Sequence, residues 1–204
     1  MGFFDSLVLP QSAEHITLLH YMTKLILFVF LPFLSVLIGG ATISVFYKNK
    51  GLKENNSIFL RFAKEIIELI TINKTAGLLM GLLPMLALIF IYSQLLHLAK
   101  VASVTYLIFS LVTITIGVIL IFTYRYSLSV KKIIDSSSNP NDEAKDLSEN
   151  LSTLNNKSGT WGLIMLYVAS YFFIAGTTYA IYPESWDASF SVFNLFLRSE
   201  EHTS

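Results

Sequence analysis

The stretch that decides the fold is LILFVFLPFLSVLIGGATISVFY, residues 25–47, which contains no charged side chain. A transmembrane helix needs about 20 predominantly apolar residues, and this stretch has that length and composition. Three further windows without Asp, Glu, Lys or Arg follow, at residues 76–97, 102–124 and 160–182. The sequence therefore predicts an all-α integral membrane protein, a bundle of four transmembrane helices over residues 25–182.

The composition of the whole chain agrees with a membrane protein and excludes several classes of function. Only 14% of the 204 residues are charged, whereas a soluble domain has about 25%. The formal net charge is zero, so no basic surface predicts a nucleic-acid partner. The chain has no cysteine, which excludes disulfides, iron–sulfur ligation, thiolate catalysis and covalent c-type haem attachment within it.

The distribution of lysine and arginine predicts how the four helices are oriented. Eleven of these residues lie in the two long connections, 48–74 and 125–157, and three lie elsewhere, namely Lys24, Lys100 and Arg198. The positive-inside rule then makes both long connections cytoplasmic loops and both termini external. We expect a multi-pass protein of the bacterial inner membrane, surrounded by the lipid bilayer.

The segments outside the four windows have different characters. Residues 1–24 form an external N-terminal segment, and residues 183–204 an external amphipathic tail that lies along the interface or docks on a partner. Apolar residues recur at helical spacing within 58–73, which predicts an amphipathic helix with Phe59, Phe62, Ile66, Leu69 and Ile70 on its apolar face. The second long connection is rich in Ser, Asn and acidic residues from 135 to 159, which predicts a flexible loop.

Small residues predict where helices approach each other closely. Gly77 and Gly81 form the small-xxx-small pattern of packed membrane helices, and Pro84 after them predicts a kink. Gly162, Ala169 and Gly176 recur every seven residues, which predicts one flat helix face that a partner helix or a planar porphyrin could use.

Three of the four histidines are predicted to meet at one membrane face. His15 and His20 precede the first window, and His97 ends the second. Histidine is the usual axial ligand of b-type haem, and helix bundles build such sites from facing helices. His20 and His97 are the preferred ligands of the haem iron. His15 lies about 140° around a helix from His20, so the two cannot both face one ligand on a regular helix. His15 is the reserve, because Pro10 and the start of the helix can shift the face on which it lies. The alternative is that these are ordinary hydrogen-bonded residues at a membrane boundary.

Lys24 shares a helix face with His20, because the two residues are four positions apart. With Glu14, the pair could line an external quinone site or contact a haem propionate. Alternatively, Lys24 is a boundary residue whose ammonium group extends into water.

Residues 16–97 resemble part of subunit I of the cytochrome bd quinol oxidases. The shared features in and before the second window are Ile72-Asn73, Gly77, Gly81-Leu82, Tyr92-Ser93 and His97. In the first window they are an external histidine, Pro32, Gly39 and the VFYKNKG motif at 45–51. Met85 replaces the family's mid-helix glutamate, the family's second half is absent, and the family's histidine lies closer to the proline than His20 does. The resemblance therefore implies a half-sized, four-helix relative that does not reduce oxygen.

Two functions follow from the sequence. The first is a membrane subunit of a respiratory or electron-transfer complex, which binds haem b or a quinone near the outer face. Such a subunit would pass electrons to other membrane subunits or to an external cytochrome c, and would be at most the electron-transfer part of an oxidoreductase. The second is a cofactor-free structural or assembly subunit. A transporter ranks last, because no Asp, Glu, Lys or Arg lies within the four windows.

Overall fold

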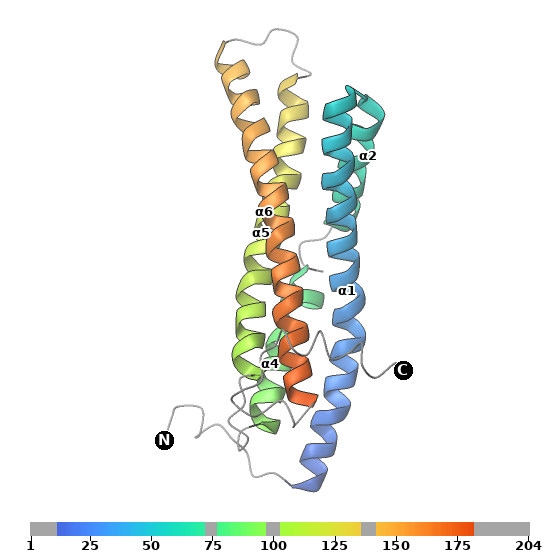
Figure 1. Cartoon of the computed structure of the whole chain (residues 1–204), viewed down its shortest axis with the longest axis vertical. Helices are drawn as coiled ribbons and strands as arrows, with labels where there is room; N and C mark the ends of the chain where they lie inside the picture. The colour runs from blue at the N-terminus through green and yellow to red at the C-terminus, as the bar shows by residue number, and fades with distance from the viewer. Residues whose placement is uncertain (1–11, 72–76, 97–102, 136–141, 182–204) are drawn as a thin grey trace, which may run out of the picture.

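The computed structural model describes residues 12–71, 77–96, 103–135 and 142–181, and nearly all of these residues are helical. The elements are α1 (Ala13–Glu54), α2 (Ser57–Ile70), the π-helix η2 (Leu78–Leu82), α4 (Leu83–Leu95), α5 (Ser103–Asp135) and α6 (Asp142–Ile181). They make one elongated bundle, in which α2 folds back beside the upper part of α1 and α4 lies in the lower half (Figure 1). We call the end near Asn55, Asp135 and Asp142 the turn end, and the opposite end, near His15, the histidine end.

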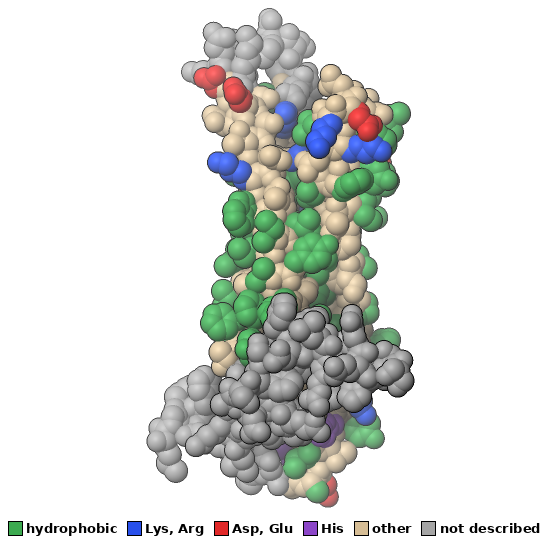
Figure 2. Space-filling view, viewed as in Figure 1, with side chains coloured by type: hydrophobic (Ala, Val, Ile, Leu, Met, Phe, Trp, Pro, Cys, Tyr) green, Lys and Arg blue, Asp and Glu red, His purple; other side chains and the backbone are tan. Residues whose placement is uncertain are grey.

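Three of the described helices, α1, α5 and α6, are long and apolar enough to cross a membrane. At most 33% of the residues in their apolar windows are buried inside the protein, so most of these side chains face outward. Figure 2 shows them as an apolar band, beyond which charged side chains gather at the turn end. The helices therefore fit a multi-pass membrane protein. The second predicted window holds a shorter apolar helix, Leu79–Leu95, and the count of four crossings stays a prediction.

The prediction of a flexible loop between the third and fourth windows is wrong for most of its length. Helix α5 continues to Asp135, and α6 already begins at Asp142. The polar residues that suggested a loop are in part buried against α5. Asn155 and Ser158 are each only 3% exposed, and a Cβ added at Gly159 would lie 2.9 Å from Cδ2 of Tyr124.

Helices α5 and α6 are joined along their length by a seam with a seven-residue period. The hydroxyl of Ser103 donates to the carbonyl of Gly176 at 2.6 Å, and that of Ser110 donates to the carbonyl of Ala169 at 2.8 Å. A Cβ added at Gly162 would lie 3.1 Å from side-chain atoms of α5. The predicted flat face of α6 is therefore confirmed as a helix-packing face, and its partner is α5. Such a repeat keeps two helices in contact over many turns.

The turn between α1 and α2 is built by two consecutive asparagines. Asn55 ends α1 in the left-handed conformation (φ 53°, ψ 34°), which Asn tolerates better than most residues. Asn56 caps α2, since its Oδ1 accepts from the backbone N–H of Ile58 at 2.9 Å. The turn lets α2 return along α1.

Helix α2 packs on small residues of α1. The hydroxyl of Ser44 donates to the carbonyl of Ala63 at 2.7 Å, and a Cβ at Gly51 would lie 3.0 Å from the side chain of Leu60. The helix predicted here is confirmed, but the prediction of which residues form its buried face is partly wrong. Ala63 and Ile67 are its buried residues, whereas Leu69 is 70% exposed and Phe62 42% exposed. Close packing selects the small Ala63, a residue that the hydropathy pattern does not single out.

The second window departs from regular α-helix geometry where Pro84 predicts it. Proline lacks an N–H and clashes with the carbonyl four residues earlier, and the π-helix Leu78–Leu82 immediately precedes α4. Gly81 faces α1 as predicted, because a Cβ there would lie 2.8 Å from Cε1 of Phe33. Gly77 does not face a described helix, since a Cβ there would meet no atom of the described residues within 4 Å.

Candidate functional site

At the histidine end, His15 is the predicted ligand that faces the bundle. Helix α1 begins here because the hydroxyl of Ser12 accepts from the backbone N–H of His15 at 3.2 Å. His15 is one helical turn before the buried Leu19, so it continues the core-facing stripe of α1. Its Nε2 atom is buried and has no hydrogen-bond partner among the residues that the structure describes. A buried imidazole nitrogen without a partner is unusual, and a bound water, ion or cofactor would each supply one.

Of the other predicted site residues, the structure describes His20 and Lys24, and both differ from His15 in being exposed. His20 and Lys24 are exposed on α1, and the Nζ atom of Lys24 lies 5.5 Å from the centre of the Tyr21 ring. His97 lies outside the described residues, as do the fourth histidine, His202, and the amphipathic tail. Across the described ranges, no three His, Asp or Glu side chains group to hold a metal ion. A haem iron needs only one or two imidazoles, so this does not bear on haem.

At the turn end, Tyr124 of α5 lies at the centre of a buried polar cluster that the sequence did not predict. Its hydroxyl lies 3.1 Å from the hydroxyl of Ser44 on α1. Its backbone carbonyl accepts from the side-chain amide of Asn155 on α6 at 3.1 Å, and that amide also donates to the hydroxyl of Ser127 at 2.9 Å. Tyr124 has no exposed surface, and through Ser44 the cluster reaches the backbone of Ala63 on α2.

Lys48 of α1 adds a positive charge to this cluster. The residue is only 5% exposed. Its ammonium group donates to Oδ1 of Asn156 at 3.3 Å and lies 5.4 Å from the centre of the Tyr124 ring. The three ion pairs found among the described residues are Lys50–Glu54, Arg61–Glu65 and Lys64–Glu68, so none of them neutralises Lys48. A buried charge is costly unless it is paired, which makes Lys48 an unusual residue.

A pocket of about 630 Å³ opens beside Lys48, between the ends of α1 and α6. Below it the two helices are in contact, because the hydroxyls of Thr42 and Tyr167 lie 3.0 Å apart. The lining contains three lysines, five hydroxyl or amide side chains and one leucine: Lys48, Asn49, Leu52, Lys53, Ser152, Thr153, Asn156, Lys157 and Thr160. None of the described acidic side chains lines it.

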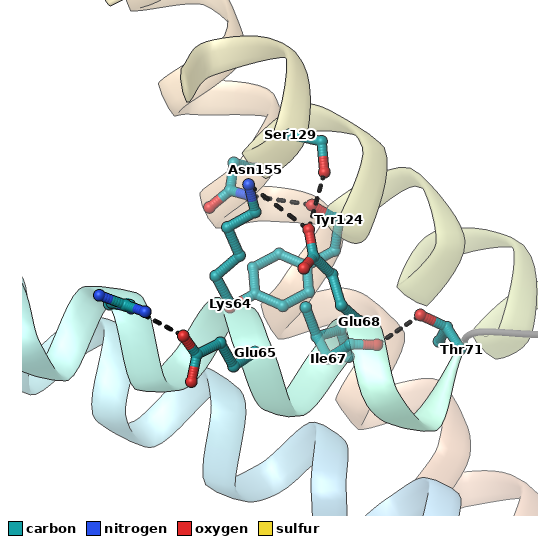
Figure 3. Close-up of polar contacts among 9 residues, drawn as sticks. Lys64, Glu65, Ile67, Glu68, Thr71, Tyr124, Ser129 and Asn155 are labelled. Atoms are coloured by element: carbon teal, nitrogen blue, oxygen red, sulfur yellow. Dashed lines mark hydrogen bonds and ion pairs between the residues drawn. The ribbon is translucent and has the colours of Figure 1, made fainter. Parts of the chain in front are cut away.

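Helix α2 closes the other side of the cluster with polar contacts to α5 (Figure 3). Glu68 pairs with Lys64 at 3.4 Å and accepts from the hydroxyl of Ser129 at 3.3 Å. The guanidinium of Arg125 donates to the backbone carbonyl of Thr71, at the end of α2. These contacts hold α2 against α5, whereas Lys48 is one of the three lysines that line the pocket between α1 and α6.

One signal in the sequence could have identified Lys48. Buried residues recur along α1 every three or four positions, at Leu34, Leu37, Ala41, Ser44 and then Lys48. A lysine that continues a core stripe is a candidate buried charge, whereas the count of basic residues treats it only as part of a loop. No protein-family model, curated protein or solved structure matches this chain, so the resemblance over residues 16–97 stays a prediction.

Proposed function

We propose that this chain is the membrane subunit of an electron-transfer complex in a bacterial inner membrane, with four crossings and external termini. In this proposal His15 holds the iron of a b-type haem near the outer face, and His97 is the second ligand that the family resemblance suggests. The supporting observation is the buried, unpartnered Nε2 atom of His15, which is the atom that an axial imidazole offers to iron. A bound haem would supply one-electron transfer. A quinone hydrogen-bonded to the same nitrogen is the other cofactor of this class.

The protein's own residues would position the cofactor and separate it from water. His15 lies on the bundle-facing side of α1, and its helix is fixed at that end by the Ser12 cap. The external cytochrome c and the other membrane subunits expected from the sequence are partners in this proposal.

The test is optical spectroscopy of the purified chain and of single histidine variants. Wild-type protein should show the reduced-minus-oxidised spectrum of a b-type haem. His15→Ala and His97→Ala should each lose most of it. His20→Ala is the matched control, because His20 is an exposed histidine on the same helix five residues away. A haem-free wild type, or full haem content in His15→Ala, would overturn haem ligation. A haem-free wild type that binds a quinone through His15 would support the quinone form.

A cofactor-free structural subunit is the second candidate, and the α5–α6 seam favours it. The flat face that could have admitted a porphyrin is occupied by α5, as the 2.6 Å and 2.8 Å serine–carbonyl hydrogen bonds indicate. This candidate predicts that the purified chain binds neither haem nor quinone. It also predicts that His15→Ala leaves co-purification with partner subunits unchanged.

A further inference from the structure

The pocket at the turn end combines three features that point to one class of ligand. Among the described residues its lining holds three lysines and no carboxylate, it offers hydroxyl and amide donors, and its deepest lysine, Lys48, is only 5% exposed. Lysine ammonium groups and Ser, Thr and Asn donors are the groups that bind phosphate oxygens. A phosphate next to Lys48 would supply the negative charge that the described residues do not.

The place of the pocket along the helices suggests how a phosphate would be presented. Lys48 immediately follows the apolar window 25–47, and Thr160 is the first residue of the window 160–182. Both residues line the pocket, so it lies at the edge of the apolar band. Phospholipid phosphates lie at that depth, and basic pockets between membrane helices on the cytoplasmic side bind anionic head groups.

We propose that this pocket binds the phosphate of an anionic phospholipid head group. In this arrangement the acyl chains lie along the outward apolar surface of α1 and α6, and the phosphate lies between them. Lys48 contacts it from inside the pocket, while Lys53 and Lys157 contact it from the two rims.

The design of the variants follows from the exposure of these lysines. Lys48→Gln changes a buried residue and can disturb folding, so the rim variants Lys53→Gln and Lys157→Gln carry the test. Both side chains are exposed, one on each helix. Lys50→Gln is the matched control, because Lys50 is on α1 like Lys53 and its substitution removes the same charge. Its ammonium group pairs with Glu54 at 3.9 Å, and it does not line the pocket.

The experiment measures lipid retained by the purified 204-residue chain in native mass spectrometry, with phosphatidylglycerol and phosphatidylcholine offered in equal amounts. Wild type and Lys50→Gln should retain phosphatidylglycerol in preference. Each rim variant should weaken that preference about fivefold, and the double variant about 25-fold, as expected for one lost lysine contact each. Circular dichroism of the variants confirms that the helices remain.

A second arm separates lipid from soluble phosphate compounds. Inorganic phosphate and glycerol 3-phosphate are added to the protein in detergent, and the thermal midpoint is measured. Neither should raise it as phosphatidylglycerol does. Stabilisation by the soluble compounds without lipid retention would overturn the lipid assignment. If Lys50→Gln weakened the preference for phosphatidylglycerol as much as the rim variants do, the pocket would be overturned as the binding site. The lipid would then be attracted only by general surface charge.

Discussion

Tyr124 illustrates what a single residue contributes here and why sequence reasoning missed it. It ends the third predicted window, so hydropathy identifies it only as an aromatic residue at a membrane boundary. Its partners are Ser44, 80 positions away, and Asn155, 31 positions away. Local patterns cannot reveal contacts between residues so far apart in the chain. His15 is the opposite case. Its proximity to the first window made it a candidate, and only the packing of α1 separated it from the exposed His20.

The hydroxyl of Tyr124 should contribute modestly to stability. Tyr124→Phe removes its hydrogen bond with Ser44, while the Ser44 hydroxyl keeps its bond to the carbonyl of Ala63. No buried donor is then left without a partner, so the expected loss is about 1 kcal/mol of unfolding free energy. Chemical unfolding in detergent, followed by circular dichroism, measures it. Tyr21→Phe, at a residue that is 65% exposed, should change little. A loss of more than about 3 kcal/mol would show that the hydroxyl has a larger role.

At the scale of helices, the apolar windows were predictable because hydropathy is a local property of the sequence. The ends of the helices were not. Residues 142–159 have the composition of a loop, yet Asn155, Ser158 and Gly159 are buried and pack on α5 in register with Gly162 and Ala169. The seven-residue period was visible from Gly162 onward. Extending it backwards by seven positions reaches Asn155, so the periodicity already contained the helical extension that composition concealed.

Close approach of α5 and α6 should depend on Gly176. A Cβ there would lie 3.0 Å from Cγ of Leu107 and 3.1 Å from the backbone carbonyl oxygen of Ser103, and backbone cannot rotate away. Gly176→Leu should therefore destabilise the bundle by about 1–3 kcal/mol, the scale of overpacking. Gly39→Leu is the control, because a Cβ at Gly39 meets no atom within 4 Å and both variants gain similar helix propensity. Equal thermal midpoints for the two variants would contradict the α5–α6 seam.

For the whole molecule, the described part of the chain places the start of α1 and the end of α6 at the same end of the bundle (Figure 1). The four crossings predicted from the sequence would also place these two ends together, and the number of crossings and the side of the termini stay predictions. The sequence also predicted the amphipathic helix and the irregularity near Pro84, but not the π-helix Leu78–Leu82 or the burial of Ala63, because these depend on packing rather than on mean hydropathy.

The orientation prediction can be tested with single cysteines, because the natural chain has none. Lys50→Cys, near the turn end, should react only with a thiol reagent supplied on the cytoplasmic side. Ser12→Cys, at the histidine end, should react only from outside. Ser137→Cys and Ser199→Cys extend the same test to residues outside the described ranges, with cytoplasmic and external labelling expected respectively. Labelling of Lys50→Cys from outside would reverse the predicted orientation.

The continuous helix of α6 has a mechanical consequence. Residues 142–159 extend about 27 Å beyond the last apolar window, at about 1.5 Å per residue, and no break separates them from the part within the apolar band. Such an arm converts rotation into translation. A tilt of α6 by about 10° within the bilayer would move its far tip sideways by about 5 Å, which is about the pitch of one helical turn.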